Sequence, residues 1–592
     1  MTLWQIVHPF SRQTDPPSTE ERPAETTRET ADQLLYSFVL LILGKAFLME
    51  PFVIPTGSMA PTLYGRHKEC QCEACDFEYQ IGASCEVPEG GSKLITGTRI
   101  LLSTCPNCQH PNDVKDSLAF NGDHVLVNKW SFILAEPQRW DVFVFKYPSN
   151  PAKNFIKRLV GQPNERIRIR QGDVYRVGQR NEAILRMDQP RKRRAACILV
   201  HDNAYDCPPL EQAGWPRRWA GQGWEDAGSS LTLKAATGQT AWLTYTHYMP
   251  SPRDWEDALA GRPLSPRPRL VTDYCPYNSY TGPGYANPSQ RSAPTPAERI
   301  DAGIFWVPDL AVECEADLGD ASEGATLTAE LVDGVYRYRC RIDLNTGRAE
   351  LLSVNTQMDP NEERPMASAD TSVRGGGRYR LRFSNIDDRL TLWVDDAVVD
   401  FGEGARYLRD RSDNSLPTRA DLSPVRIGVA GAAATVGRLK LFRDLYYRAE
   451  GRPMNSPDVA RYRETLISQQ TDPDAYARTM ADADPAFRVQ DLQTGEGEYI
   501  ALGDNSPQSN DSRAWDEDNR VVPANHLVGK AFWTYWPHGV PFLNNGRGIP
   551  VRYHYAQLQD PETGRMSWQK LTDYPRYSVP FYPNVRRMTR IR

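Results

Sequence analysis

The stretch NFIKRLVGQPNERIRIR, residues 154–170, alternates apolar and polar positions on either side of a Gly-x-Pro turn. Alternation with a period of two is the pattern of a half-buried β-strand. Two further alternating runs precede it, HVLVNKW at 124–130 and DVFVFKY at 141–147, and a Gly-Asp turn follows at 172–173. Together these runs predict a β-sheet and place the chain in the mainly β class.

Composition supports the same fold class. The chain has 592 residues, a length at which we expect roughly three or four domains. Its 46 prolines, 41 glycines and 40% hydrophobic residues suit strands joined by many turns better than a helical bundle. The formal net charge is only -5, so charge does not indicate nucleic acid as a partner.

One strongly apolar segment lies near the N-terminus. Residues 34–44 carry no charge, and residues 46–49 extend the apolar run past Lys45. A bilayer requires about 20 apolar residues, a length reached here if Lys45 extends toward an interface. No small-x-small site follows, so we expect a retained transmembrane helix over 32–50 rather than a buried helix or a cleaved signal peptide. Residues 1–31 are expected to form a disordered tail, whose mixed charges do not orient the anchor.

The cysteines near the N-terminus form two pairs with the same spacing, Cys72-x-x-Cys75 and Cys105-x-x-Cys108. Two such knuckles predict a zinc-ribbon-like insert over residues 68–112, with a structural Zn²⁺ held by four thiolates and no open position for catalysis. Disulfides are the competing interpretation, because this segment is expected on the oxidising side of the membrane. Further donors leave the ligand set ambiguous: Cys70, Cys85 and His110. The remaining cysteines show no metal spacing and are expected in the core or in disulfides: Cys197, Cys207, Cys275, Cys314 and Cys340.

Residues 179–300 show no sustained period and are expected to form an irregular insert. Strand patterns return over 301–448, separated by Gly-rich or Asp-rich turns, and predict a jelly-roll β-sandwich. The WVDDAVV hairpin and the closing GRLKLFRDL strand resemble concanavalin-like modules of the laminin-G and sugar-binding kind, which implies a glycan or protein ligand. A helical connector is expected over 449–489, and a C-terminal tail over 551–592.

A candidate nucleophile follows the apolar segment directly, at Ser58 in IPTGSMAPTL. A serine needs a base to accept its proton, either a histidine or a lysine kept neutral by burial. Lys157 is flanked by apolar residues on a predicted strand, where desolvation would lower its pKa. The histidines lie beside turns or cysteines without a paired carboxylate: His67, His110, His124 and His526.

Four motifs follow one another after the apolar segment: IPTGSMAPTL, GDHVLVNKW, FIKRLVGQP and GDNSPQSNDSR. In this order they resemble the signature boxes of bacterial type I signal peptidases, the leader peptidases with a Ser-Lys dyad. The resemblance covers residues 34–65, 121–175 and 496–537. It implies a β-barrel-like catalytic domain, split over 51–178 and 490–550.

The resemblance also implies a function. Such enzymes are single-pass proteins of the cytoplasmic (inner) membrane, with the catalytic domain on the extracytoplasmic side. They remove signal peptides from secretory preproteins at Ala-x-Ala-type sites, and their catalysis needs no cofactor. The expected partners are therefore preproteins and the lipid bilayer, without nucleic acid.

Carried over by motif, Ser58 is the nucleophile and Lys157 the general base. Thr56 stands where a family hydroxyl, often a serine, completes the oxyanion hole, and Ser509 stands where a serine orients the lysine. The supporting residues are a turn of Gly503, Asp504 and Asn505 and an ion pair of Asp511 and Arg513. The substrate pockets for small side chains are expected at Ile54, Met59 and Phe155.

Two other hypotheses compete with this one. Self-cleaving repressors of the DNA-damage response use a similar Ser-Lys fold, but they would need a DNA-binding N-terminus where this chain has an apolar segment. A catalytically silent surface protein could bind glycan through the sandwich and a partner through the ribbon. It would have no physical need of Ser58, Lys157 and Ser509 together.

Overall fold

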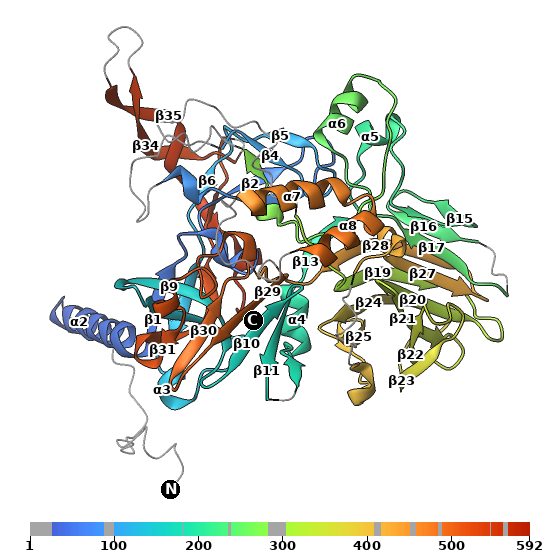
Figure 1. Cartoon of the computed structure of the whole chain (residues 1–592). Helices are drawn as coiled ribbons and strands as arrows, with labels where there is room; N and C mark the ends of the chain where they lie inside the picture. The colour runs from blue at the N-terminus through green and yellow to red at the C-terminus, as the bar shows by residue number, and fades with distance from the viewer. Residues whose placement is uncertain are drawn as a thin grey trace, which may run out of the picture. The chain divides into compact units, whose positions relative to one another are not determined.

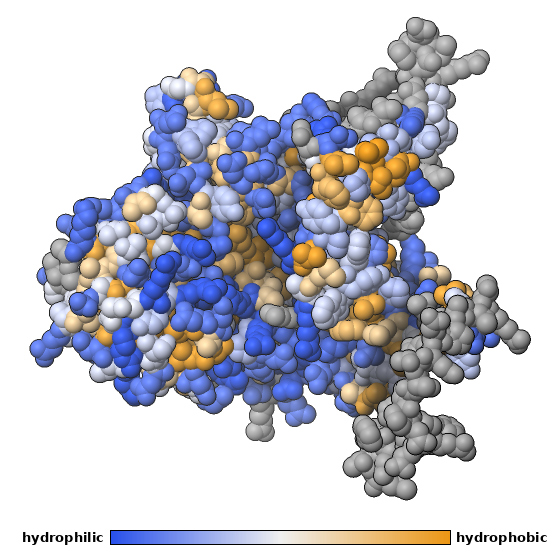
Figure 2. All heavy atoms as spheres, turned by 180° about the vertical axis from the view of Figure 1, so that it is seen from behind, coloured by the Kyte–Doolittle hydropathy of each residue, from blue (hydrophilic) through white to orange (hydrophobic). Residues whose placement is uncertain are grey.

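The computed structural model describes residues 27–87, 100–179, 181–234, 238–281, 303–407, 416–449, 457–483, 488–544, 546–559 and 566–591. Strands in several antiparallel sheets dominate these residues (Figure 1), so the prediction of a mainly β protein is confirmed. Polar and charged side chains cover most of the face shown in Figure 2, where apolar ones gather in separate patches. The helices are α2 (Thr27–Leu43), α3 (Ser131–Leu134), α4 (Pro190–Ala196), α5 (Pro208–Gln212), α6 (Pro252–Leu259), α7 (Pro457–Gln469) and α8 (Pro473–Asp482).

The N-terminal unit ends at Glu50 and is described from Thr27 onward. Helix α2 has 17 residues, and a π-helical turn over Gly44–Leu48 follows it. The backbone is already extended at Met49, so the helix does not run to residue 50 as predicted. Among the described residues, no helix combines the length and apolar character that a membrane span requires. Of the predicted tail, residues 1–26 lie outside the described part, and residues 27–31 belong to α2.

A seven-stranded sheet carries two of the four motifs, on β7 and β9, and the other two motifs directly follow its strands β1 and β30. Its strand order is β1-β7-β32-β8-β9-β30-β31, so strands from both ends of the chain lie side by side. The predicted runs at 124–130, 141–147 and 154–170 supply β7, β8 and β9. The strand bounds are β1 (Met49–Val53), β7 (His124–Asn128), β8 (Val142–Tyr147), β9 (Asn150–Gly161), β30 (Glu498–Leu502), β31 (Val522–Pro523) and β32 (Leu527–Trp536).

Strand β8 shows why this sheet is stable. Successive side chains on a strand point to opposite faces, and all four residues from Val142 to Phe145 are buried. The two valines belong to a cluster with Ile54, Met59 and Val125, whereas the two phenylalanines belong to another with Leu159 and Trp515. The sheet therefore separates two apolar clusters and is covered on both faces.

The next sheet continues the chain after β9. Its order is β12-β11-β10-β29, and β10 pairs with both β11 and β29 in antiparallel register. The second half of the stretch 154–170 therefore forms β10, as its alternation predicts. The bounds are β10 (Arg166–Arg170), β11 (Asp173–Val177), β12 (Glu182–Ile184) and β29 (Val489–Gln493).

Two small sheets hold the cysteine-rich segment, in the orders β3-β2-β6 and β18-β4-β5. Two-stranded pairings of β34 with β35 and of β33 with β36 follow near the C-terminus, where only a tail was predicted. The bounds are β2 (His67–Gln71), β3 (Glu78–Gly82), β4 (Leu102–Thr104), β5 (Pro111–Asp113), β6 (Ala119–Phe120), β18 (Tyr280–Thr281), β33 (Gly539–Pro541), β34 (Ile549–Gln559), β35 (Met566–Val579) and β36 (Phe581–Pro583).

The largest insert is a β-sandwich of two antiparallel sheets. One has the order β15-β16-β28-β19-β24-β25-β26, with β13 also paired to β28, and the other has the order β14-β17-β27-β20-β21-β22-β23. The bounds are β13 (Ile198–Asp202), β14 (Trp219–Ala220), β15 (Trp224–Asp226), β16 (Ser230–Leu233), β17 (Ala241–Tyr245), β19 (Leu310–Leu318), β20 (Thr326–Asp333), β21 (Tyr336–Asp343), β22 (Arg348–Asn355), β23 (Arg364–Asp370), β24 (Arg378–Ile386), β25 (Arg389–Val394), β26 (Ala397–Val398), β27 (Val425–Ala430) and β28 (Ala434–Arg443).

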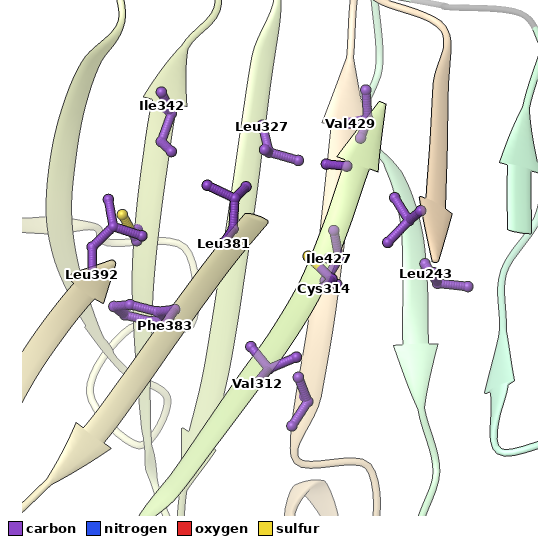
Figure 3. Packing of buried hydrophobic residues seen from close by; sticks show 14 of the residues in the cluster. Leu243, Val312, Cys314, Leu327, Ile342, Leu381, Phe383, Leu392, Ile427 and Val429 are labelled. Atoms are coloured by element: carbon purple, nitrogen blue, oxygen red, sulfur yellow. The ribbon is translucent and has the colours of Figure 1, made fainter. Parts of the chain in front are cut away.

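The core of the sandwich fills the space between these sheets. Figure 3 shows Val312, Leu381 and Phe383 from one sheet facing Leu327 and Ile427 from the other. These side chains come from alternate positions along their strands, which is the pattern of sheets that face water on their other side.

One expected boundary differs from the structure. Residues 179–300 were expected to be irregular, yet β13 to β17 belong to both sheets of the sandwich, and each has only two to five residues. Strands of two to five residues that are separated by turns and short helices make no sustained period in the sequence. Helices α7 and α8 lie in the expected helical connector at 449–489.

Candidate active site

Ser58 lies at the centre of a short 3₁₀ turn, Gly57–Met59, which follows extended backbone at Thr56 (φ -123°, ψ 160°). The turn is buried, and Ser58 keeps 9% of its surface exposed. A Cβ on Gly57 would overlap the ring of Tyr277, so only glycine fits at the first position of this turn. The sequence PTGSM therefore places the serine hydroxyl on a tightly packed turn.

Lys157 is the partner of this serine. It lies on β9 and is 4% exposed, and its Nζ donates to Ser58 Oγ at 2.6 Å and to the Ile156 carbonyl at 3.1 Å. The ammonium also lies 5.4 Å from the centre of the Phe155 ring. The structure thus brings together the two residues for which the sequence predicts nucleophile and base.

Burial lowers the pKa of Lys157 from 10.5 to about 8, because the charged amine is desolvated. The carboxylates of Asp511 and Asp504 raise the pKa of Lys157, and Arg513 lowers it. A lysine with a pKa of about 8 is neutral in roughly one molecule in ten at pH 7, far more often than an ordinary lysine. It can then accept a proton from the serine hydroxyl.

The turn at 503–505 contacts the backbone of the serine turn through hydrogen bonds from Asn505. The Asn505 N–H donates to the Ser58 carbonyl at 3.1 Å, and Asn505 Nδ2 donates to the Gly57 carbonyl at 3.0 Å. A Cβ on Gly503 would lie 2.5 Å from the Ser58 carbonyl oxygen and would also overlap Ser509 Oγ. Glycine is therefore required at 503 for the backbone to approach the serine this closely.

A buried ion pair fixes this turn to β9. Arg158 Nε donates to Asp504 Oδ1 at 2.7 Å, Arg158 Nη2 donates to Oδ2 at 2.5 Å, and Thr62 Oγ1 donates to Oδ2 at 2.6 Å. Both charged side chains are almost fully buried. Arg158 is not among the predicted site residues, although a second cation directly after Lys157 within an apolar strand is a signal in the sequence.

The predicted pair of Asp511 and Arg513 is also present. Arg513 donates to both carboxylate oxygens, at 2.9 and 2.7 Å, and the Gly503 N–H donates to Asp511 Oδ2 at 2.9 Å. The Arg513 guanidinium beside it keeps the pKa of Asp511 below its usual value, although burial acts in the opposite direction as the largest single effect. This pair stabilises the turn at 503–505, because Asp511 accepts the hydrogen bond from the Gly503 N–H.

The other predicted site residues differ in how far they are buried. Ser509 is buried beside Asp511, and among the described residues Lys157 Nζ donates to Ser58 and Ile156 rather than to Ser509, so the orienting role of Ser509 stays a prediction. Thr56 is exposed and its side chain does not cap the turn. Ile54 and Met59 lie in the apolar cluster beside the sheet, at 2% and 0% exposure, rather than on an open surface. Phe155 is half-buried and stacks on Tyr147.

The insert contributes a residue that the sequence did not reveal. Asn278 and Asn505 form a reciprocal amide pair, in which each Nδ2 donates to the other's Oδ1 at 2.8 and 2.9 Å. The same Asn505 amide holds the Gly57 carbonyl. No motif surrounds Asn278, so nothing in the sequence indicated that the insert reaches the serine turn.

The four cysteines of the two knuckles form a second buried cluster. Their sulfur atoms all lie within 4.8 Å of one another, with Cys72 Sγ 3.5 Å from Cys108 Sγ and Cys75 Sγ 3.7 Å from Cys105 Sγ. Four thiolates around Zn²⁺, with bonds of about 2.3 Å, place their sulfurs roughly 3.8 Å apart. The donor set and its spacing fit this metal.

The backbones of the two knuckles are alike. The N–H of Asp76 donates to the Cys72 carbonyl and that of Gln109 to the Cys105 carbonyl, each at 2.9 Å. Asp76 and Gln109 both adopt left-handed backbone, with φ of 59° and 61°. Equivalent turns thus present the two cysteine pairs to each other.

The other cysteines neither form disulfides nor join the group of four. All eleven cysteines lie within the described residues and none of these forms a disulfide. Cys70, Cys85 and His110 stay outside the group of four. Burial raises the pKa of Cys70 to about 12 and that of Cys85 to about 11, so both remain protonated thiols.

Relatives of this chain share the segments that build the site. It matches the family described as "Signal peptidase, peptidase S26" over residues 101–213 and 427–536, which include Lys157 and the turn at 503–505, whereas Ser58 lies before them. It is 31% identical to Signal peptidase I of Pseudomonas fluorescens over 143 residues, 22% of this chain and 30% of that one. It is 30% identical to Signal peptidase I of Pseudomonas aeruginosa over 143 residues, with the same two shares. The chain thus spans less than a third of the length of these relatives.

Among solved structures, the carbohydrate binding module CBM66 from Bacillus subtilis is 10% identical, with a TM-score of 0.19. That match covers 38% of this chain and 92% of the module. A TM-score this low supports neither a shared fold nor a shared ligand.

The family match resumes after a long gap, on strands that lie in the same sheet. Its first part contains β8 and β9 and its second part contains β30 and β32, which are neighbours in the order β32-β8-β9-β30. The chain therefore carries a domain that matches the signal peptidase, peptidase S26 family, and inserted sequence splits this domain.

Proposed function

We propose that this chain is a serine endopeptidase that removes N-terminal signal peptides from secretory preproteins, with Ser58 as nucleophile and Lys157 as general base. The observation that carries the proposal is the 2.6 Å contact between Lys157 Nζ and Ser58 Oγ, in which the lysine is buried. The match to the signal peptidase family supports the choice of substrate.

In the proposed reaction, Ser58 Oγ attacks the carbonyl carbon of the scissile bond while the neutral Lys157 amine takes the hydroxyl proton. The resulting ammonium gives this proton to the leaving amine, and an acyl-enzyme ester remains on Ser58. Water, deprotonated by the same amine, then hydrolyses the ester. This chemistry needs no cofactor.

The developing oxyanion needs donors outside the dyad. We assign this role to the backbone N–H of Ser58 and the hydroxyl of Thr56, which stands two residues before it. Thr56 is exposed and its hydroxyl caps no helix, so it is available to a bound substrate. Phe155, half-buried beside the ammonium, supports a preference for small residues before the scissile bond.

Contact with a membrane is part of the proposal. The apolar side chains of α2 that are described are largely exposed, which suits a lipid environment better than water. A single-pass location in the inner membrane, with the catalytic domain outside the cytoplasm, remains a prediction. The exposed residues are Leu34, Leu35, Tyr36, Phe38, Val39, Leu40, Ile42 and Leu43.

The test is cleavage of a preprotein with an Ala-x-Ala site by the purified full chain in detergent micelles. Ser58→Ala and Lys157→Met are each expected to lower kcat by roughly 10³-fold or more. Lys153→Met is the matched control, because Lys153 lies exposed on the same strand, and it should retain activity. Undiminished cleavage by either dyad variant would refute the mechanism.

The cysteine cluster is proposed to hold a structural Zn²⁺ through Cys72, Cys75, Cys105 and Cys108. Four thiolates leave no open coordination position, so the ion would stabilise the cysteine-rich insert without taking part in hydrolysis. A glycan or protein ligand for the β-sandwich stays a prediction.

A further inference from the structure

A second group of metal-binding side chains lies on β2, directly before the first cysteine knuckle. His67 and Glu69 are two residues apart on this strand, so their side chains project from the same face. His538 joins them from the segment after β32 in the seven-stranded sheet. One ligand atom of each of the three residues lies within 4.8 Å of the others.

Both imidazoles of this group have an unsatisfied ring nitrogen. His67 Nδ1 lies 2.8 Å from the Gly65 carbonyl, to which it must donate, and Nε2 is then an unprotonated acceptor. Within the described residues His67 Nε2 and His538 Nδ1 have no hydrogen-bond partner, although the two side chains are only 0% and 3% exposed. Buried polar atoms without a partner are rare in proteins, and binding of an ion is one of their ordinary explanations.

The third ligand supplies a negative charge. Glu69 Oε1 lies 3.2 Å from His538 Nε2, a separation that two ligands of one ion can have, and the Glu69 side chain keeps 31% of its surface exposed. The nearby cation Arg587 is already paired, because its Nη2 donates to Asp123 Oδ2 at 2.9 Å. Glu69 Oε1 also accepts a long hydrogen bond from Asn584 Nδ2 at 3.4 Å, and Oε2 is the carboxylate oxygen left for a metal.

We infer that His67, Glu69 and a ring nitrogen of His538 form a second metal site, for a first-row divalent ion such as Zn²⁺. Two imidazoles and one carboxylate are a ligand set that this ion accepts, and they leave one position for water. The site is distinct from the four cysteines, because Lys68 and Cys70 occupy the opposite face of β2.

Such an ion would connect the cysteine-rich insert to the catalytic sheet. Glu69 belongs to the insert predicted over 68–112 and His67 lies directly before it on β2, whereas His538 follows β32. The ring of His67 lies 5.3 Å from that of Tyr64, which stacks on Tyr277, the residue packed over the Gly57 position. A metal here would thus stabilise the packing that surrounds the serine turn.

The test is metal analysis of the full chain, purified in detergent, stripped and reloaded with Co²⁺. Thiolate ligands give Co²⁺ an intense near-ultraviolet charge-transfer band, which imidazole and carboxylate ligands do not give. We expect a Co²⁺ equivalent that binds without this band, and its loss in Glu69→Gln and His538→Ala. His526→Ala is the control and should keep it.

Glu69→Gln preserves size at a partly exposed position, so its folding can be verified by an unchanged circular dichroism spectrum. The inference fails if folded Glu69→Gln and His538→Ala bind as many equivalents as the wild type, or if every bound equivalent shows the thiolate band. If the cysteines bind no metal, the wild type should bind one Co²⁺ equivalent without the thiolate band. Loss of that equivalent in both Glu69→Gln and His538→Ala would still support the inference. The dyad is tested by cleavage instead, so the two proposals can fail separately.

Discussion

The backbone N–H of Asn505 donates a hydrogen bond to the carbonyl of Ser58 at 3.1 Å, although the Cys-rich segment and the whole sandwich lie between them in the sequence. The same asparagine side chain binds the Gly57 carbonyl and the amide of Asn278. The serine turn is thus held by the last motif of the family domain and by the insert together. The insert therefore takes part in ordering the serine turn.

Asn278→Ala is expected to lower kcat with little change in KM. It removes the amide pair that orients Asn505, and hydrogen bonds of this kind contribute about 1 kcal/mol each, so a roughly 5- to 30-fold loss is expected. Steady-state cleavage of a preprotein measures it. Asn361→Ala, in an exposed turn of the sandwich, should leave kcat unchanged. A wild-type kcat in Asn278→Ala would show that the pair does not position the serine.

Gly503→Ala is expected to abolish most activity while the chain still folds. The new Cβ would lie 2.5 Å from the Ser58 carbonyl oxygen, so the serine turn must move away from Lys157. A displacement of about 1 Å at a nucleophile can cost roughly 10²-fold in rate. Gly238→Ala is the matched control, because a Cβ at Gly238 meets nothing within 4 Å. Equal activities of the two variants would contradict the geometry.

The pH dependence of kcat/KM should report the base. The pKa of Lys157 is lowered by burial to about 8, and only the neutral amine accepts the serine proton. Activity should therefore rise with pH through about 8, level off above it, and fall about tenfold per unit well below it. A rate profile on a substrate without groups titrating in this range measures the midpoint. A midpoint near 10.5, the ordinary value for lysine, would mean that the base is not buried during catalysis.

Sequence patterns were sufficient wherever a local rule decides the structure. Alternation predicted β7, β8 and β9, and motif order predicted that Ser58 and Lys157 meet. The WVDDAVV stretch forms the expected hairpin between β25 and β26, with Asp395 and Asp396 at φ of 49° and 66°. Consecutive positive φ values are typical of the tight turns in hairpins, which aspartate tolerates.

Contacts between distant segments could not be predicted in the same way. Asn278 reaches Asn505 from a segment without a motif, and the strands β13 to β17 are recognisable only through their partners in the sandwich. The burial of Ile54 and Met59 depends on how the serine turn packs against the sheet. Long-range packing, which decides such positions, leaves no periodic signal in the sequence.

Asp504→Ala is expected to destabilise the catalytic domain by about 3–5 kcal/mol, because it leaves the buried Arg158 guanidinium without its counter-charge. Both side chains are at most 1% exposed in this pair. Urea unfolding of the full chain, followed by tryptophan fluorescence, measures the change. Asp113→Ala is the matched control, since its pair with Lys115 is half exposed and should not affect stability detectably. Similar unfolding midpoints for both variants would show that the buried pair is not stabilising.

Removal of metal from the cysteine cluster should destabilise the cysteine-rich insert. The four thiols are buried and make no disulfide, so without an ion they retain only weak contacts with one another. Cys105→Ser is expected to lose the Co²⁺ equivalent that shows thiolate charge transfer and to melt at a lower temperature than the wild type, since structural Zn²⁺ binding contributes directly to folding. Cys314→Ala, a buried thiol of the sandwich core, should keep that equivalent. The opposite result has two parts: the reloaded wild-type chain shows no thiolate band, and its four knuckle thiols react with a thiol reagent before any chelator is added. This result would indicate that the knuckles fold without metal.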